Sequence, residues 1–186
     1  MNKMIKTLTI LFFASLLLVA CNKQPTIQEY YVQKQESNNF IAIDLPASLL
    51  KVGDEASQET KETMATIKKL NILAFKITEA NAAEYQTEAA QVKEILKGKK
   101  YNELMRMKHK NMNIIINYEG ADDAINEFVL FAADNEKGFA LARVLGNKMQ
   151  PEKIMKMAED FKNIDKEEAG DALGQITELF GDLDMD

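Results

Sequence analysis

Residues 101–145 repeat an alternation of apolar and polar side chains with a period of two, which is the spacing of a half-buried β-strand and not of a helix. Polar turn sequences at 108–111, 119–123 and 134–138 divide this stretch into four segments. The third segment, 125–133, is apolar at both odd and even positions, as a strand inside a sheet is. Short polar turns between such segments predict a meander of four antiparallel strands.

The residues outside this meander alternate between strand and helix signals. Residues 40–45 (FIAIDL) are apolar at odd and even positions and are ended by Pro46, which predicts a strand buried on both faces, and 71–78 predicts another strand. Apolar residues three and four apart predict helices over 54–70, 81–96, 151–161 and 166–183. The predicted order is β-α-β-α-β-β-β-β-α-α. This order indicates an α+β fold in which about six mainly antiparallel strands carry helices on one face.

The first 20 residues have the pattern of an export signal. A short basic start precedes an uncharged run, residues 7–20, which is too short to span a bilayer. The run ends with Leu18, Val19 and Ala20 directly before Cys21, the only cysteine in the chain. This spacing is similar to a bacterial lipobox, so we expect cleavage before Cys21 and acylation of this residue as a lasting membrane anchor. An ordinary secretory signal that leaves a free thiol is the alternative.

The segment after this cysteine is polar. Residues 22–39 contain Pro25 near their start and a short apolar group, Tyr30–Val32. They predict a tether, with at most a short strand, that holds a folded domain away from the membrane surface. The chain is thereby divided into a signal peptide (1–20), a lipidated cysteine with its tether (21–39) and a single domain (40–186).

The residue types that carry most catalytic chemistry are scarce in the predicted mature chain. With Cys21 acylated, no thiol remains for a disulfide, a redox pair or a thiolate metal site. His109 is the only histidine, so a histidine zinc site lacks a second ligand and a serine triad would depend on this single ring. The eight glycines form neither a dinucleotide-binding nor a phosphate-binding loop. These observations predict no catalytic residues, no metal, no nucleotide and no other cofactor.

The strand sequences FIAIDLPASLL, NILAFKIT, INEFVLFAAD and ALARVLGN, together with the YNELMRM hairpin, resemble a family of small Bacteroidetes-type envelope lipoproteins. That family is classed only as a domain of unknown function. The resemblance extends from about residue 40 to about residue 161, and it implies no catalytic residues because none is assigned in the family. The gene context of some members implies an alternative role, as an accessory component of an envelope-stress or sigma-factor signalling system.

Charge is unevenly distributed along the chain. Residues 21–118 carry 14 Lys and Arg against 12 Asp and Glu, whereas 119–186 carry 7 against 17. Positive charge is concentrated in 93–110, where seven basic residues oppose two glutamates. Two interpretations stay open: a patch for lipid headgroups or polysaccharide phosphates, or a solvated helix end beside an edge strand that lysines protect from pairing. The acidic balance, the predicted export and the few aromatic residues in this segment argue against nucleic acid as a partner.

Two hypotheses of a metal site are weaker than their structural alternatives. Asp182, Asp184 and Asp186 have the spacing that opens a calcium loop, but the glycine and glutamate of such a loop are absent, which favours a solvated tail. A group of methionines together with His109 suggests a copper(I) site, yet use of methionine as core filler is the favoured explanation. These methionines are Met105, Met107, Met112, Met149, Met155 and Met157. We expect His109 to be an exposed residue of a hairpin turn.

The predicted helix 166–183 is the strongest candidate for an interaction surface. Leu173, Ile176 and Phe180 lie on its apolar stripe, opposite an acidic face. Gly170 and Gly174 weaken it as an isolated helix, so it needs a packing partner. Its own sheet and a second protein are both open, and Leu173, Ile176 and Phe180 are the candidate partner-binding residues.

These observations lead to one functional expectation and one rival. We expect an exported protein that is anchored in the bacterial cell envelope through Cys21, at the outer rather than the inner membrane, and that binds a ligand or an envelope protein without catalysing a reaction. The rival class is an enzyme built on carboxylates alone. Such an enzyme needs an acid of raised pKa in a cleft.

Overall fold

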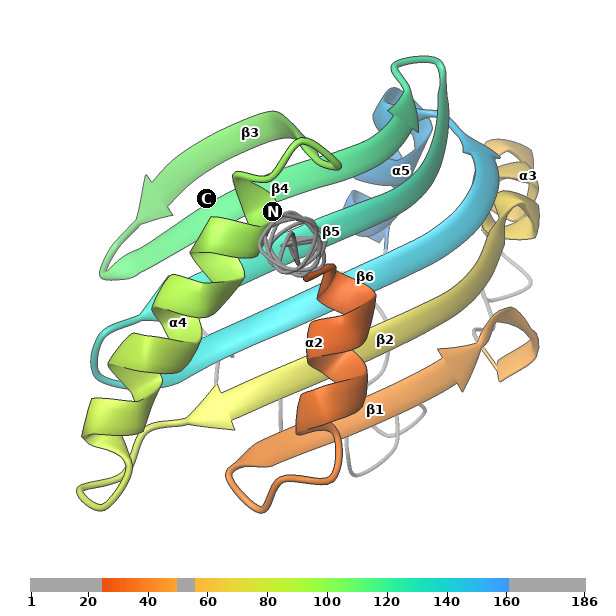
Figure 1. Ribbon diagram of the computed structural model, residues 1–186. Helices are drawn as coiled ribbons and strands as arrows, with labels where there is room; N and C mark the ends of the chain where they lie inside the picture. The colour runs from red at the N-terminus through yellow and green to blue at the C-terminus, as the bar shows by residue number, and fades with distance from the viewer. Residues whose placement is uncertain (1–24, 50–55, 161–186) are drawn as a thin grey trace, which may run out of the picture.

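The computed structural model describes residues 25–49 and 56–160, which form one antiparallel sheet with helices against it (Figure 1). The strands are β1 (Phe40–Pro46), β2 (Ile67–Lys76), β3 (Asn102–His109), β4 (Met112–Ala121), β5 (Ala124–Asp134) and β6 (Gly138–Met149). Their spatial order is β1-β2-β6-β5-β4-β3, and every neighbouring pair is antiparallel. The helices are α2 (Ile27–Lys34), η1 (Ala47–Leu49), α3 (Gln58–Thr66), α4 (Ala82–Leu96) and α5 (Pro151–Asp160). The predicted α+β class and the four-strand meander are confirmed.

The α-helices of the described residues cover both faces of the sheet, which corrects the prediction of a single covered face (Figure 1). α2 and α4 pack on one face over an aromatic cluster that includes Phe75, Tyr85 and Phe139. α3 and α5 pack on the other face through Met64 and Ile154. The physical reason is that the central strands are apolar at odd and even positions alike. Each face therefore has to be removed from water by its own layer of helices.

Residues 27–34 form helix α2, where the sequence predicted a tether. Thr26 and Glu29 close a capping box: the Glu29 N–H donates to Thr26 Oγ1 at 3.2 Å, and the Thr26 N–H donates to Glu29 Oε2 at 2.7 Å. Ile27 and Tyr30 on the inner side of the helix are fully buried. The folded domain thus includes residues before residue 40. The Thr-x-x-Glu spacing was the signal that could have predicted this helix.

Two further elements differ from their predicted form. β1 is an edge strand that pairs, within the described residues, only with β2. Only two of its seven residues, Phe40 and Ile43, are buried, so it is less buried than expected. The helix predicted over 54–70 is shorter, because Ser57 caps α3 by accepting the Thr60 N–H at 3.1 Å and Ile67 already enters β2. None of the helices in the described ranges is long and apolar enough to cross a membrane.

The turn between β5 and β6 packs closely against β2. Gly138 has φ +126°, and a Cβ atom on it would lie 1.9 Å from the carbonyl oxygen of Phe75 in β2. Only glycine permits this approach, which lets β6 run between β5 and β2. The resulting register places Asn71 of β2 directly opposite Arg143 of β6.

Candidate functional site

A row of polar side chains crosses the otherwise apolar face of the sheet beneath α2. Asn71, Glu127 and Arg143 are 3%, 3% and 6% exposed. Arg143 Nε donates to Glu127 Oε1 at 2.7 Å, Nη1 donates to Asn71 Oδ1 at 3.4 Å, and Nη2 donates to Gln28 Oε1 of α2 at 3.3 Å. An ion pair between two strands, β5 and β6, is therefore held in the interior and linked to the helix above it.

Glu127 is the carboxylate at the centre of this network. Burial alone would raise its pKa, but the hydrogen bond and the charge of Arg143, with a further contribution from Lys100, hold the pKa below its usual range. Lys100 Nζ lies 3.1 Å from Glu127 Oε2, and the Tyr101 hydroxyl donates to Glu127 Oε1 at 3.2 Å. Glu127 is thus ionised at neutral pH and holds no proton that it could donate to a substrate.

Side-chain contacts fasten α2 to the rest of the domain near both of its ends. At its start, the Ile27 N–H donates to the Tyr101 hydroxyl at 3.2 Å. Further along, the Tyr30 hydroxyl donates to Glu88 Oε2 of α4 at 2.7 Å, and Lys34 forms an ion pair with the other oxygen of Glu88. Tyr30 is fully buried in the hydrophobic core, and its pKa is raised, first by this burial and then by the hydrogen bond to Glu88. α2 is therefore an integral part of the domain.

A groove of about 250 Å³ opens between the end of α4 and the start of β3, and we call it the basic groove. Its exposed lining residues are Lys93, Lys97, Glu103 and Arg106, and its buried lining residues are Leu96, Tyr101, Ile115 and Asn117. Arg106 pairs with Glu103 at 2.6 Å, which lowers the pKa of that carboxyl, and Lys97 pairs with Glu94 at 2.7 Å. The Lys93 ammonium makes no ion pair or hydrogen bond with the described residues.

Asn117 lies at the buried side of the basic groove and is 2% exposed. Its Nδ2 donates to the carbonyl oxygen of Leu96 at 3.4 Å, at the last turn of α4. Its Oδ1 is also buried, but it accepts no hydrogen bond within the described part of the chain. A buried acceptor in this state costs about 1–3 kcal/mol.

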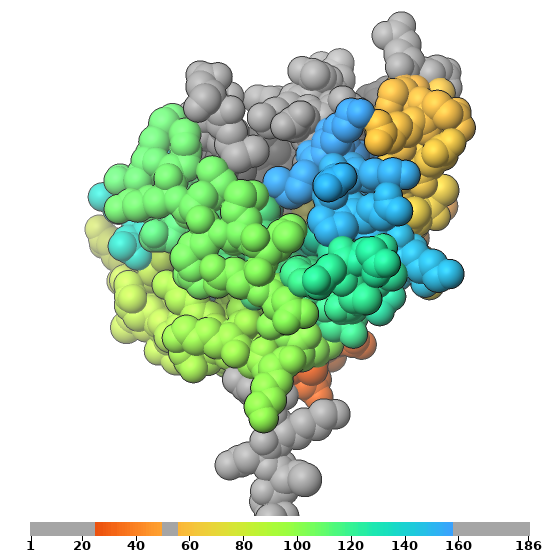
Figure 2. All heavy atoms as spheres, turned by 90° about the horizontal axis from the view of Figure 1, so that it is seen from above, coloured from red at the N-terminus to blue at the C-terminus, as the bar shows by residue number. Residues whose placement is uncertain are grey.

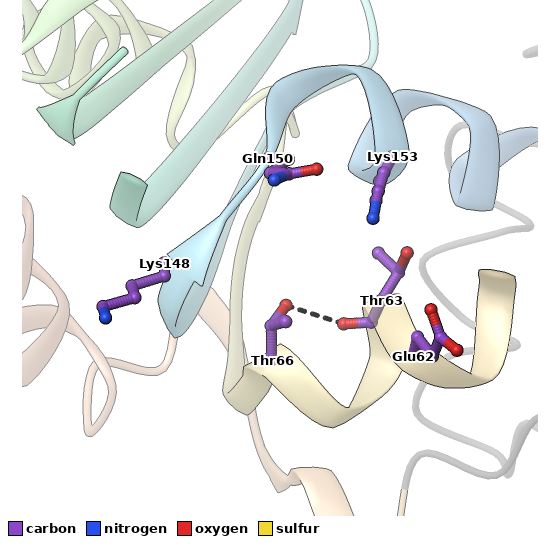
Figure 3. Close-up of a pocket in the computed structure, with 6 residues that line it drawn as sticks. All are labelled: Glu62, Thr63, Thr66, Lys148, Gln150 and Lys153. Carbon is purple, nitrogen blue, oxygen red and sulfur yellow. Dashed lines mark hydrogen bonds between the residues drawn. The ribbon is translucent and has the colours of Figure 1, made fainter. Parts of the chain in front are cut away.

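A second groove, of about 200 Å³, lies between α3 and the junction of β6 with α5 (Figure 3). Its lining residues are Glu62, Thr63, Thr66, Lys148, Gln150 and Lys153. Lys153 points across the groove toward Thr63, whereas Lys148 points away (Figure 3). The Thr66 hydroxyl is already used, because it donates to the Thr63 carbonyl oxygen at 2.7 Å. In neither groove nor elsewhere in 25–49 and 56–160 do three His, Cys, Asp or Glu residues gather as they would to hold a metal ion.

A family described as a domain of unknown function, DUF4252, matches residues 30–157. The chain belongs to the DUF4252 family. No curated protein and no solved structure matches it. The DUF4252 match confirms the resemblance to a family of unknown function, and it covers all six strands and the linings of both grooves.

The functional residues predicted from sequence lie outside the described residues and outside the DUF4252 match. They are the lipobox residues Leu18, Val19 and Ala20, the acylation site Cys21, and the candidate contact residues Leu173, Ile176 and Phe180. The three aspartates at the end of the chain also lie outside both ranges. All of these assignments stay predictions.

The methionines of the DUF4252 domain are core residues, as their favoured explanation predicted. Met112, Met149 and Met157 are buried in the cluster under α3 and α5, and Met105, Met107 and Met155 pack against it. His109 differs from expectation: it is the last residue of β3 and is half-buried. Its Nε2 is buried and has no hydrogen-bond partner in the described ranges.

Sequence reasoning missed the polar residues that the fold brings together in the DUF4252 domain. Glu127 and Arg143 each interrupt an apolar strand sequence, INEFVLFAA and ALARVL, at a position that faces the core. Asn117 does the same in β4. A single polar residue on the inward parity of an apolar strand was the available signal, because such a residue has to find a partner when it is buried.

Proposed function

We propose that this protein is exported, is fastened through acyl chains on Cys21 to a membrane of the bacterial cell envelope, the outer membrane in preference to the inner, and acts there by binding. The observation that carries the proposal is the uncharged run 7–20, which ends in a Leu-Val-Ala sequence directly before the only cysteine. Acylation with two or more chains is sufficient for a lasting anchor, whereas one chain is marginal.

The position of α2 supports a short link between the anchor and the domain. Cys21 precedes Ile27, the first residue of α2, by six residues. A chain of that length spans at most about 20 Å when fully extended. An acylated Cys21 would therefore keep the domain close to the membrane surface, with the start of α2 on the membrane side, instead of on the long tether that the sequence predicted.

The state of the carboxylates favours binding over catalysis. A general acid built from a carboxyl group needs a pKa raised toward neutrality. Glu127, the buried carboxylate of the polar row, has its pKa lowered by Arg143 and Lys100 despite its burial, and Glu103 in the basic groove has its pKa lowered by Arg106. Neither group holds a proton at neutral pH, so neither supplies the general acid that the rival class of enzyme needs.

The test of the anchor is Cys21→Ser, with Asn22→Ser as the matched control one residue along the chain. Cells are grown with a labelled fatty acid, and the protein is then fractionated and its intact mass is measured. We expect the unchanged protein and the Asn22→Ser variant to carry the label, to lack residues 1–20 and to fractionate with membranes. The Cys21→Ser variant should lose the label. An unprocessed first methionine, or a bare Cys21 thiol on the native protein, contradicts the proposal.

For a protein partner in the envelope we propose contact with helix 166–183. Its apolar residues Leu173, Ile176 and Phe180 share one predicted stripe, and the two glycines of the helix make it dependent on a packing surface. The partner's surface would be apolar at its centre and basic at its rim, to match the acidic face of this helix.

A further inference from the structure

We propose that the basic groove binds the phosphate-bearing headgroup of an anionic lipid in the membrane to which the protein is anchored. The location of the ligand in this membrane rests on the proposed acylation of Cys21. The chemistry of the groove rests on Lys93, Lys97, Arg106 and Asn117, whose positions do not depend on the anchor.

The groove and the start of α2 lie at the same edge of the molecule. Tyr101, which lines the groove, accepts the N–H of Ile27 at 3.2 Å. In Figure 1 the end of α4 lies beside the start of α2, and in Figure 2 the light green residues that follow α4 lie beside the red-orange start of α2. Since only five residues lie between Cys21 and Ile27, the groove lies within reach of the surface that holds the acyl chains.

The exposed side of the groove offers positive charge for a phosphate. The Lys93 ammonium is not engaged by the described residues, and the bond of Lys97 to Glu94 is between two side chains that are each about two-thirds exposed. An exposed pair of this kind contributes little to stability, so Lys97 can exchange Glu94 for a phosphate at small cost. Arg106 has further donors beyond the two that it gives to Glu103. The positive charge of these side chains attracts an anionic headgroup before any contact forms.

At the buried side of the groove, the Oδ1 of Asn117 lacks a hydrogen-bond donor within the described residues. The Oδ1 of Asn117 accepts nothing within the described residues, although it lies in the interior of a domain where such acceptors are normally paired. A lipid phosphodiester alone supplies acceptors only. A headgroup that also carries a hydroxyl, such as phosphoglycerol, supplies oxygen atoms to the lysines and, where the lining moves aside to admit it, a donor to the buried Oδ1 of Asn117. We assign the groove to this class.

The experiment measures vesicle binding by the mature chain, residues 21–186, with Cys21→Ser so that no acyl group is present. Vesicles contain phosphatidylglycerol in phosphatidylcholine, or phosphatidylcholine alone, at low ionic strength. The test variant is Lys93→Gln/Lys97→Gln. The matched control is Lys108→Gln/Lys110→Gln, which removes the same charge at the far end of β3. Circular dichroism and a melting curve are recorded for each protein.

We expect binding to the phosphatidylglycerol vesicles and none to phosphatidylcholine alone. Each lysine should contribute about 5-fold, so the Lys93→Gln/Lys97→Gln variant should bind roughly 25-fold more weakly. The control variant should stay within about 2-fold of the unchanged chain, since its lysines lie away from the groove. Equal loss in both variants would show that net charge alone is responsible, and that result overturns the proposal.

Two other outcomes also overturn it. If the lysines only offset the negative end of the α4 dipole, Lys93→Gln/Lys97→Gln lowers the melting temperature and leaves vesicle binding unchanged. If soluble glycerol phosphate binds with the lysine dependence described above while vesicles of the two compositions bind alike, the ligand is a free phosphate compound.

The assignment of Asn117 is tested with vesicles of phosphatidylethanol, which has the same single charge as phosphatidylglycerol but no hydroxyl. We expect binding to be several-fold weaker than to phosphatidylglycerol, and equal binding removes Asn117 from the site. Failure of the anchor and failure of the groove are distinguishable, because acylation is measured on Cys21 of the native protein and headgroup binding on a chain that has no acyl group.

Discussion

Replacement of Glu127 by glutamine removes the negative charge at the centre of the buried polar row while it keeps the side chain's shape. The amide oxygen can still accept from Arg143, but the guanidinium loses its counterion at a position where its side chain is only 7% exposed. Lys100, which is 38% exposed, can turn to water instead. The substitution therefore lowers the free energy of unfolding mainly because it leaves the buried guanidinium of Arg143 without a counterion.

The magnitude follows from this burial. Removal of one partner from a buried ion pair destabilises proteins by about 3–5 kcal/mol, because the remaining charge stays without compensation. Since glutamine retains one hydrogen bond and Gln28 and Asn71 also accept from Arg143, we expect the lower end, about 3 kcal/mol. The matched control is Glu136→Gln, the same chemical change at an exposed turn position, with an effect within about 0.5 kcal/mol.

The assay is urea unfolding followed by far-UV circular dichroism and tyrosine fluorescence, because the chain has no tryptophan. The midpoint should fall while the slope stays unchanged. The pKa of Glu127 is lowered in the folded state, so its contribution is complete above the unfolded pKa of about 4.3 and is lost as pH falls through the lower folded value. The difference between the two proteins should therefore be constant at neutral pH and shrink below about pH 4.

A double substitution tests the physical reason directly. If the stranded charge dominates, Glu127→Gln/Arg143→Met should lose less free energy of unfolding than Glu127→Gln loses by itself plus Arg143→Met by itself. A loss below about 1 kcal/mol for Glu127→Gln, or additive losses in the double variant, would refute the reasoning.

Three other predictions concern the backbone, the tyrosines and the end of the chain. Gly138→Ala should lower the free energy of unfolding by about 3 kcal/mol, because the new Cβ would clash with the Phe75 carbonyl oxygen and because φ is positive at this residue. A thermal melt checks this prediction, and a loss below about 1 kcal/mol contradicts it. All five tyrosines have raised pKa values, four mainly through burial and Tyr118 mainly through its hydrogen bond to Asp122, so phenolate absorbance should develop at higher pH in the folded protein than in urea. Because the unfolded chain loses its phenolic protons first, stability should be complete below about pH 10 and decline above it, and coincident titrations would contradict this. Truncation after Asn163 should leave the melting temperature unchanged within about 2 °C, since the family match ends at residue 157. A large drop would show that the predicted helix 166–183 packs on its own domain.

Local patterns were sufficient for the elements with a strong period. The alternation over 101–145 predicted all four strands of the meander, and Pro151 marked the start of α5 as expected. α2 was missed, despite the capping-box spacing of Thr26 and Glu29, because it has only eight residues and half of them are polar. Its stability comes from Ile27 and Tyr30 against the sheet, and contacts of that kind have no local signature.

The candidate site was less accessible to sequence reasoning than the fold. The sequence showed the positive charge that begins at residue 93. Whether it forms a binding patch or a solvated surface depended on the side chains that the fold places beside it. The groove exists because α4 ends over β4, where Asn117 donates to the Leu96 carbonyl oxygen across a separation of 21 residues. The start of α2 reaches the same edge through Tyr101, which is 74 residues from Ile27 in the sequence.

The sequence by itself determined the six strands, the helices α3, α4 and α5 and the α+β class, because periods of two and 3.6 residues decide which side chains can share a face. It also contains the whole argument for the anchor at Cys21. Tertiary structure alone decided that helices cover both faces, that Glu127 and Arg143 meet in the interior, and that Tyr101 of the basic groove contacts the start of α2. These features depend on strand order and register, which arise when many weak contacts between distant residues are satisfied together and no short segment can specify them.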